Sequence, residues 1–206
     1  MEETKMTNIE FLEKLELAHS KPNLYATGAF GAPTGVYNNN DRYYENTYKN
    51  VGKKYADKII KAPDGTFLFD CLGLGKGIVY SWSANPEMRY GGAIYKYNDI
   101  PDFSIKSLHK YCEWVECDCV DYSRIQPGEW LRTIDNTHVA YYLVDGWIME
   151  MTTSGDGVIR IVPISTRKWN GHGKLNYIEY VSESKPIGEL TCPYCGKTIK
   201  LFTDSH

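Results

Sequence analysis

The spacing of apolar residues changes part-way along this chain of 206 residues. Up to about residue 112, apolar side chains recur every three to four positions, which is the period of an amphipathic helix. From about residue 128 they alternate with polar side chains, which is the period of a strand. Helices followed by antiparallel strands predict an α+β fold, with N-terminal helices packed on a central antiparallel β-sheet.

The first part of the chain is expected to contain four helices. Thr7 and Glu10 have the form of a capping box, which starts a helix over 7–20 that ends before Pro22. The other helices are expected over 41–61, from Asp70 or Cys71 to about 83, and over 104–112. The segments 21–40 and 84–103 are rich in Gly, Pro and Asn, and are expected to be loops.

Five strands are expected in the second part. They are the segments 128–132, 138–144, 147–151, 158–162 and 177–181. The dipeptide Asp145-Gly146 between the second and third of these is a strong hairpin signal. No internal repeat is visible.

Cys71 stands where the apolar pair Leu68-Phe69 meets a predicted helix. The thiolate is the nucleophilic form of cysteine, and the start of a helix lowers a thiol pKa because it carries about half a positive charge. A histidine beside the thiol lowers this pKa further and returns the proton to a leaving amine. His138 and Glu150, on successive predicted strands, are the candidates for that histidine and for the polar group that orients it. The sequence therefore predicts a cysteine hydrolase.

Whether Glu150 shares a face with His138 depends on the turn at Asp145-Gly146. A two-residue loop puts the two side chains on opposite sides of the sheet. A three-residue loop, with Gly146 in the left-handed conformation, puts Ala140 opposite Glu150 and makes the acid a diagonal neighbour of His138. The catalytic interpretation requires an odd-length or bulged turn, or a four-residue turn with even pairing, because one residue of slip reverses every side chain.

Each of these residues also has a simpler interpretation. A single cysteine before a glycine-rich helix is often a small buried apolar residue. A single histidine on a strand is often a partly buried polar group, and Glu150 on a two-sided sheet can face water. A helix-borne cysteine followed by a strand-borne histidine is the papain-like arrangement, and this order favours the catalytic interpretation.

Three segments resemble the NlpC-type family of papain-like cysteine peptidases, which cut bacterial cell-wall peptides. They are Phe69-Asp70-Cys71-Leu72-Gly73-Leu74, Gln126-Pro127-Gly128-Glu129-Trp130 and His138-Val139-Ala140-Tyr141-Tyr142-Leu143-Val144-Asp145-Gly146. The resemblance covers about residues 7–182. It implies hydrolysis of a peptidoglycan stem or bridge peptide by Cys71, His138 and Glu150, with backbone N–H groups near Cys71 as the oxyanion hole. This chemistry requires no cofactor.

Tyr25, Asp70 and His172 are the candidates for substrate-binding residues, of which His172 is chosen because of its neighbours in the sequence and has a surface loop histidine as its simpler interpretation. Tyr25 resembles the family's loop tyrosine before the nucleophile, and His172 is expected in a loop before the last strand. The chain departs from the family at Leu72, where serine is usual, and at Glu150, where His, Asn or Gln is usual. The long insertion between Tyr25 and Cys71 predicts an additional helix near the cleft.

The six cysteines are expected to be reduced, because the chain has no secretory signal and is long enough to bury a core without disulfides. Cys192-Pro193-Tyr194-Cys195 has the form of half a zinc site, and structural zinc normally takes four ligands. Cys117 and Cys119 are the candidates to complete it, with Cys112 as a spare. The alternative is a C-terminal tail with two thiols. The chain is therefore divided into a peptidase domain over 1–182 and a tail over 183–206.

Composition and charge exclude two classes of partner. The net charge is −3, and no basic block or basic helix face provides the electrostatic footprint of a nucleic-acid-binding protein. No stretch approaches the roughly 18 apolar residues that a membrane span needs. The charged segment 1–6 is not a secretory signal. The resemblance is therefore to phage or prophage lysins, which stay in the cytoplasm until released and then act at the cell wall. The oligomeric state is not constrained.

Two other functions remain open at this point. One is another papain-like activity, such as an amidase or acyltransferase acting on a different substrate, because the thiolate chemistry is shared. The other is a catalytically inactive wall-binding module, in which Cys71 is a core residue.

Overall fold

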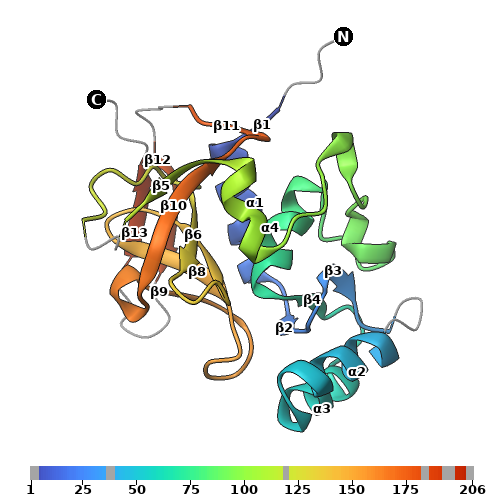
Figure 1. Ribbon diagram of the computed structural model, residues 1–206. Coiled ribbons are helices and arrows are strands. Elements are labelled where there is room, and N and C mark those ends of the chain that lie inside the picture. Colours follow the sequence, from blue (N-terminus) through green and yellow to red (C-terminus); the bar gives the residue numbers. More distant parts are fainter. Residues whose placement is uncertain (1–4, 36–39, 118–120, 182–185, 192–197, 203–206) are drawn as a thin grey trace. The chain divides into compact units, whose positions relative to one another are not determined.

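The computed structural model describes residues 5–35, 40–117, 121–181, 186–191 and 198–202. The chain forms two compact units. The sheet unit comprises Met1–Glu16, Phe103–Glu150 and Ile161–His206, and the helix unit comprises Leu17–Asp102 and Met151–Arg160. Figure 1 labels the elements of both.

The sheet unit contains a six-stranded sheet with the strand order β5-β10-β6-β7-β8-β9. The strands are β5 (Cys112–Glu116), β6 (Trp130–Thr133), β7 (Val139–Tyr142), β8 (Trp147–Met151), β9 (Ile159–Pro163) and β10 (Trp169–Leu175). β10 is antiparallel to β5 and β6, and β7 is antiparallel to β6 and β8. The predicted α+β fold with an antiparallel sheet is confirmed.

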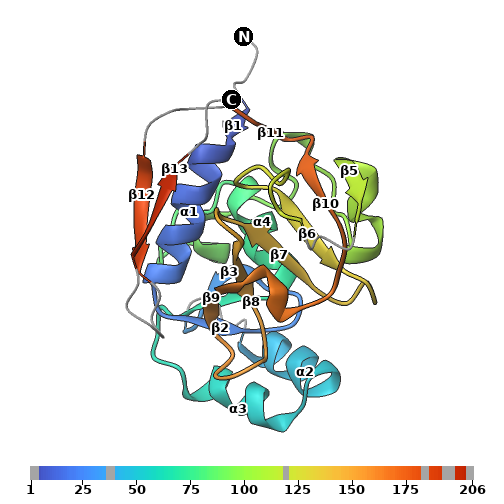
Figure 2. The same cartoon turned by 90° about the vertical axis from the view of Figure 1, so that its left-hand side faces the viewer.

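Shorter elements complete the sheet unit. β1 (Met6–Thr7) pairs in parallel with β11 (Ile178–Glu179). β12 (Pro186–Thr191) and β13 (Thr198–Phe202) form an antiparallel pair, and Figure 2 shows them side by side. Two 3-10 helices, η3 (Ile105–Tyr111) and η4 (Ile164–Thr166), also belong to this unit. Ser104 caps η3, as the sequence predicts.

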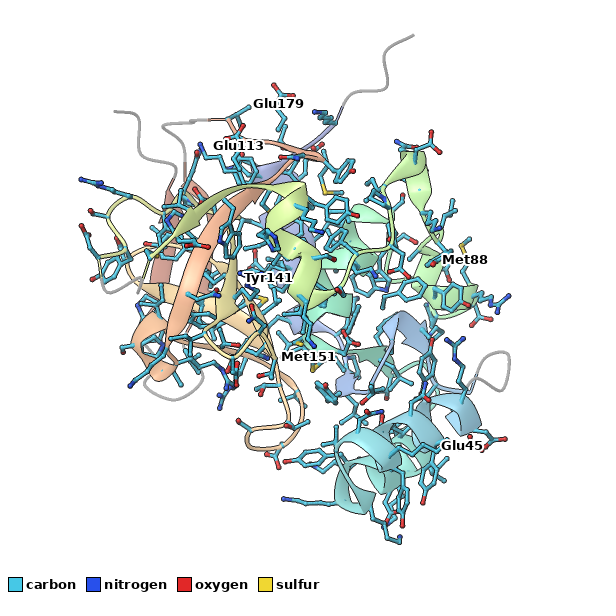
Figure 3. All side chains as sticks on the ribbon, viewed as in Figure 1. Glu45, Met88, Glu113, Tyr141, Met151 and Glu179 are labelled. Carbon is cyan, nitrogen blue, oxygen red and sulfur yellow. The ribbon has the colours of Figure 1, made fainter. Side chains whose placement is uncertain are left out.

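Helix α1 (Asn8–Ser20) begins at the predicted capping box. The Glu10 N–H donates to Thr7 Oγ1 at 3.2 Å, and the Thr7 N–H donates to Glu10 Oε2 at 2.7 Å. Phe11 packs against the rings of Trp130 on β6 and Tyr141 on β7, with centroid separations of 5.7 and 5.6 Å. Figure 3 labels Tyr141. The start of α1 therefore packs on the sheet, as predicted.

The helix unit contains a second, three-stranded sheet with the order β2-β4-β3. Its elements are β2 (Asn23–Tyr25), β3 (Phe30–Pro33), α2 (Asn40–Asn50), α3 (Lys53–Lys61), β4 (Phe67–Phe69), α4 (Cys71–Val79), η1 (Arg89–Gly92) and η2 (Tyr97–Asp99). β4 is parallel to β2 and antiparallel to β3. Its core includes Ala26, Tyr43, Ile59 and Leu68, which join the two helices α2 and α3 to this sheet.

Two predictions for the first part of the chain are wrong. The segment 21–40 is not a loop throughout, because it supplies β2 and β3 on either side of β4. The segment 41–61 is not one helix. Gly52, with φ of +121°, interrupts it between α2 and α3, which lie side by side in Figures 1 and 2. Glycine adopts this backbone conformation without the steric cost that a side chain imposes.

The third predicted helix is shorter than expected. α4 ends at Val79, and Ser81 takes a positive φ of +71°. Trp82 is then fully buried, and its indole N–H donates to the carbonyl of Gly31 at 3.3 Å. The chain therefore leaves the helix where this large side chain is placed in the core.

Two strands of the main sheet, β5 and β10, were not predicted. In β10, Gly171 and Gly173 interrupt the alternation of apolar and polar residues that marks a strand. The two glycines pack closely against Trp114 and Cys112 on β5. No helix in the described part of the chain has the length and apolar character of a membrane span. The division of the chain at residue 182 stays a prediction.

Candidate active site

Cys71 is the first residue of α4 and directly follows the buried strand β4. Asp70 is the N-cap of the helix. One carboxylate oxygen accepts from the Gly73 N–H at 2.5 Å, and the other accepts from the Gly28 N–H at 2.8 Å. The cap fixes the first turn, so the Cys71 sulfur lies in the positive field of a helix N-terminus. Both oxygens of Asp70 serve the backbone, and its predicted role in substrate binding is not tested.

Glycines in α4 allow the helix to approach β3 closely. A Cβ at residue 73 would lie 1.9 Å from the Ala29 carbonyl oxygen, and a Cβ at residue 77 would lie 2.5 Å from the Phe30 carbonyl oxygen. Any larger residue at either position would push the helix away from the strand. Gly73 and Gly77 therefore allow a close backbone approach, which anchors the helix that carries Cys71.

Tyr25 lies beside the thiol in the helix unit. It is on β2, opposite Phe69 of β4, and not in a loop as predicted. Burial, with the nearby Cys71 thiolate and Asp70 carboxylate, raises the pKa of Tyr25 well above its usual value. Its hydroxyl therefore stays protonated and can donate a hydrogen bond. We call Tyr25, Asp70 and Cys71 the thiol cluster.

The hairpin between β7 and β8 has the register that the catalytic interpretation requires. Tyr141 pairs with Met149 and Tyr142 pairs with Ile148, which corresponds to the three-residue loop. Gly146 is in the left-handed region, with φ of +76°. His138 and Glu150 therefore project from the same face of the sheet, and the two-residue loop is excluded.

His138 and Glu150 are in direct contact in the sheet unit. His138 Nε2 lies 2.6 Å from Glu150 Oε2. Arg167, just after η4, also reaches this carboxylate: its Nε lies 2.6 Å from Oε2, and its Nη2 lies 3.2 Å from Oε1. We call His138, Glu150 and Arg167 the imidazole cluster. A carboxylate held by a two-point guanidinium contact presents a fixed acceptor to the histidine ring.

Glu150 is fully buried and remains ionised. Burial alone would raise its pKa, but hydrogen bonds and charge from His138 and Arg167 outweigh burial and lower the pKa of Glu150 to about 2. Because Nε2 of His138 is held by this carboxylate, Nδ1 is the ring nitrogen that remains for proton transfer.

Arg167 was not anticipated from the sequence. It is 17 residues from Glu150, so no helical or strand spacing links the two. A buried carboxylate on a strand needs a cationic partner, so the burial of Glu150 is the signal that points to a residue such as Arg167. The sequence alone did not show this burial, because it follows from the register of the strands.

His172 is in the middle of β10, not in a loop as predicted. Its Nδ1 is hydrogen-bonded to Oε2 of Glu129, and both residues are buried. His172 lies opposite Leu131, which lies opposite Ala140, so two strand spacings, roughly 10 Å, separate β10 from β7. His172 therefore forms a separate pair with Glu129, and its predicted role in substrate binding is not tested.

Cys112 completes a second set of cysteine, histidine and glutamate residues in the sheet unit. It pairs with Leu175, so its side chain projects from the opposite face of the sheet from that of His172. Burial and the Glu129 carboxylate raise the pKa of Cys112 to about 12. This thiol is therefore protonated at neutral pH. We call Cys112, Glu129 and His172 the second set.

The zinc hypothesis falls mostly outside the described residues, because Cys192, Cys195 and Cys119 lie there. Cys117 is disulfide-bonded, whereas Cys71 and Cys112 are not, so the expectation of reduced thiols is wrong for Cys117. A sulfur atom in a disulfide is not a thiolate ligand for zinc. Within the described ranges, no group of three His, Cys, Asp or Glu residues could hold a metal ion.

Comparisons with known proteins give no family match by sequence. No family model matches the chain, and no curated protein matches it. Among solved structures, the chain is similar to the peptidoglycan hydrolase RipB from Mycobacterium tuberculosis, with 19% identity and a TM-score of 0.45 over 84% of this chain and 66% of that one. It is also similar to the P60 domain of the antigen MAP1204 from M. avium subspecies paratuberculosis, with 17% identity and a TM-score of 0.45 over 82% and 95% of the two chains. This chain thus spans less than two thirds of the RipB structure. Likeness at this level does not assign a family.

Proposed function

We propose that this protein is a cysteine peptidase that hydrolyses peptidoglycan stem or bridge peptides. Cys71 is the nucleophile, His138 is the general acid and base, and Glu150 orients the imidazole. The proposal requires the thiol cluster of the helix unit to meet the imidazole cluster of the sheet unit. The substrate class rests on the resemblance of the segments around Cys71, Pro127 and His138 to the NlpC-type family.

The position of Cys71 carries the proposal. A cysteine at the first position of a capped helix is ionised more readily than a cysteine on a strand, because the helix N-terminus stabilises the thiolate. The imidazole cluster supports the same reading. It holds one nitrogen of His138 in a fixed hydrogen bond, and leaves the other to exchange a proton with the thiol.

The reaction then proceeds in two steps. The thiol proton passes to His138 Nδ1, and the sulfur electron pair attacks the peptide carbonyl carbon to form a C–S bond. The first N–H groups of α4 stabilise the oxyanion, and the imidazolium protonates the leaving amine as the C–N bond breaks. Water next attacks the thioester, His138 takes its proton, and the C–S bond breaks to release the acid and the thiolate.

Digestion of purified peptidoglycan, with products identified by mass, tests the proposal. We expect peptides that gain one water per cleaved bond, and no such products from Cys71→Ala. Cys112→Ala is the matched control and should retain activity within about twofold. Products that show loss of ammonia from a side-chain amide, or transfer of the acyl group to an added amine, would favour another papain-like activity. Residual hydrolysis within tenfold of the parent in Cys71→Ala would exclude Cys71 as nucleophile.

Action at the cell wall after lysin-type release belongs to the same proposal. Its test is the distribution of the protein between cytoplasm and wall before and during lysis of the producing cell. Protein that stays in the soluble fraction after lysis, in the presence of intact walls, would contradict it.

A further inference from the structure

The segment that follows Glu150 leaves the sheet unit and belongs to the helix unit. β8 ends at Met151, which Figure 3 labels, and Met151–Arg160 is part of the helix unit. The segment 152–158, which we call the β8–β9 loop, then leads to β9. It follows closely in the chain on Glu150, a member of the imidazole cluster. A contact that fixes this loop in the helix unit therefore acts on chain that is continuous with the imidazole cluster.

The far end of the β8–β9 loop is bound to the thiol cluster. The Tyr25 backbone N–H donates to the Gly157 carbonyl at 2.7 Å. The Ile159 N–H donates at 2.7 Å to the side chain of Asn23, which is on β2 with Tyr25. Gly157 is buried, and a Cβ there would lie 3.7 Å from the Tyr25 Cβ. The loop therefore begins next in the chain to one cluster and ends in contact with the other.

The β8–β9 loop has little rigidity of its own. Its sequence is Thr152-Thr153-Ser154-Gly155-Asp156-Gly157-Val158, and its two glycines have φ of +78° and +75°. Glycine loses more backbone freedom on folding than any other residue, so a loop of this composition requires contacts from outside to hold one conformation. The insertion between Tyr25 and Cys71 supplies these contacts.

Tyr55, on helix α3 of this insertion, is the first attachment point. Its hydroxyl donates to the Thr153 carbonyl, and its oxygen lies 3.2 Å from the carbonyl oxygen of Gly155. A Cβ at Gly157 would lie 3.0 Å from the Tyr55 ring, so the ring and the loop are closely packed. The loop lies beside α3 in Figures 1 and 2. One side chain thus contacts the loop along most of its length.

Lys58, about one turn further along α3, is the second attachment point. Its ammonium donates to the Asp156 carbonyl at 2.5 Å and lies 3.6 Å from the carboxylate of the same residue. The ammonium also lies 5.5 Å from the centre of the Tyr55 ring, so the two side chains support each other. Because the Asp156 carboxylate is exposed, this ion pair contributes little by itself, and Tyr55 is the stronger attachment.

We propose that Tyr55 and Lys58 are positioning residues, which hold the β8–β9 loop so that the imidazole cluster meets the thiol cluster. The inference rests on the proposed function and gives the α2–α3 insertion a role in it. A misplacement of about 1 Å between reacting groups can slow an enzyme by roughly 100-fold. A loop fastened to α3 narrows the range of positions that the two clusters sample. The insertion therefore acts on the reaction through the loop, without contact with the substrate.

The pH dependence of Cys71 alkylation in Tyr55→Phe tests the inference. Phenylalanine keeps the ring against Gly157 and removes the hydroxyl. We expect the apparent pKa of Cys71 to rise by at least about half a unit, because the imidazolium is less often beside the thiolate. In His138→Ala the same substitution should cause no further rise, because no imidazole is left to position. Lys58→Met should raise the apparent pKa of Cys71 in the same direction, by a smaller amount.

Tyr44→Phe is the matched control. The Tyr44 hydroxyl is on the same insertion and lies 3.5 Å from Asp57, and among the described residues it forms no hydrogen bond with the β8–β9 loop. This substitution should leave the apparent pKa of Cys71 unchanged. Amide hydrogen exchange of the segment 152–158 reports separately on whether the loop is released. Tyr55→Phe should speed that exchange by at least about tenfold, and Tyr44→Phe should not.

An apparent pKa of Cys71 that is equal in the parent and in Tyr55→Phe would overturn the inference. An equal rise in the His138→Ala background would also overturn it, because Tyr55 would then act on the thiol without the imidazole. Hydrolysis of peptidoglycan by a parent whose Cys71 pKa does not depend on Tyr55 would leave the proposed function in place. A dependence on Tyr55 and His138 in a protein that hydrolyses no peptidoglycan would support the inference while the proposed function failed.

Discussion

The chain carries two sets of cysteine, histidine and glutamate, in surroundings that differ in two respects. Cys71 starts a capped helix, whereas Cys112 starts a strand. The Glu150 carboxylate is held by Arg167, whereas the Glu129 carboxylate accepts from His172 and from the backbone N–H of Gln126. Within the second set, the side chain of Cys112 lies on the opposite sheet face from His172.

The difference shows that these residue types alone do not make a nucleophile. An anion beside a buried thiol opposes ionisation, and this combination raises the pKa of Cys112 to about 12. A helix N-terminus acts in the opposite direction on Cys71. In the imidazole cluster, Arg167 compensates the charge of Glu150. In the proposed function, this compensation is what lets an acid take the place of the His, Asn or Gln that is usual in the family the sequence resembles.

Alkylation of the two cysteines gives the largest expected contrast. A thiol with a pKa near 12 is ionised to only about one part in 10⁵ at pH 7. We therefore expect iodoacetamide at pH 7 to label Cys71 at least about 10³ times faster than Cys112. Mass spectrometry of the labelled peptides measures both rates in one sample. Similar alkylation rates would mean that the surroundings of Cys71 do not favour its thiolate over that of Cys112.

Alanine substitution of the two histidines sharpens the same comparison. His138→Ala should reduce hydrolysis by about 10² to 10⁴, because it removes the proton-transfer group. His172→Ala should leave activity within tenfold but lower the free energy of unfolding by about 1 to 3 kcal/mol, because Glu129 loses a buried partner. Initial rates measure the change in hydrolysis, and denaturant titration measures the change in the free energy of unfolding. The reverse ranking would assign the catalytic role to His172.

Arg167→Met tests whether the guanidinium balances Glu150. Without it, the buried Glu150 carboxylate loses a two-point contact, so the free energy of unfolding should fall by about 1 to 3 kcal/mol. Denaturant titration measures this change independently of activity. Lys168→Met is the matched control, because this neighbouring cation makes no contact with Glu150 in the described structure. Equal free energies of unfolding in all three proteins would show that Arg167 has no such role.

Acid sensitivity is the smallest expected effect. The pKa of Glu150 is about 2 in the folded protein and about 4.5 when unperturbed, so its ionised form stabilises the fold above pH 4.5. That stabilisation should be lost as the pH falls from 4.5 towards 2, because over this range the unfolded chain takes up a proton that the folded protein does not. The melting temperature of Glu150→Gln should therefore decrease less over this range than that of the parent. Equal decreases in the melting temperatures of the two proteins would contradict the lowered pKa of Glu150.

Local signals predicted much of this fold. The Thr7–Glu10 capping box located the start of α1. The Asp145-Gly146 turn limited the pairing of β7 with β8 to a few registers, and the structure has the register of the three-residue loop. Cys71 was expected at a helix start because an apolar run ends at Phe69 and an acidic residue follows it. In each case the relevant residues are within a few positions of one another along the chain.

The remainder depended on contacts that are distant in sequence. β10 was hidden because glycines at 171 and 173 make room for β5, and a strand that consists partly of glycine has no alternating pattern. Arg167 contacts Glu150 although β9 and η4 lie between them along the chain. Tertiary packing determines such residues, and single-sequence spacing does not reveal them.

The pH dependence of Cys71 alkylation, measured in the parent and in His138→Ala, tests the central claim most directly. If the imidazole of the sheet unit reaches the thiol of the helix unit, the parent should react with an apparent pKa well below the ordinary thiol value of about 8.5, and His138→Ala should raise it by at least about one unit. An apparent pKa near the ordinary value that is the same in both proteins would contradict the catalytic pairing of Cys71 with His138.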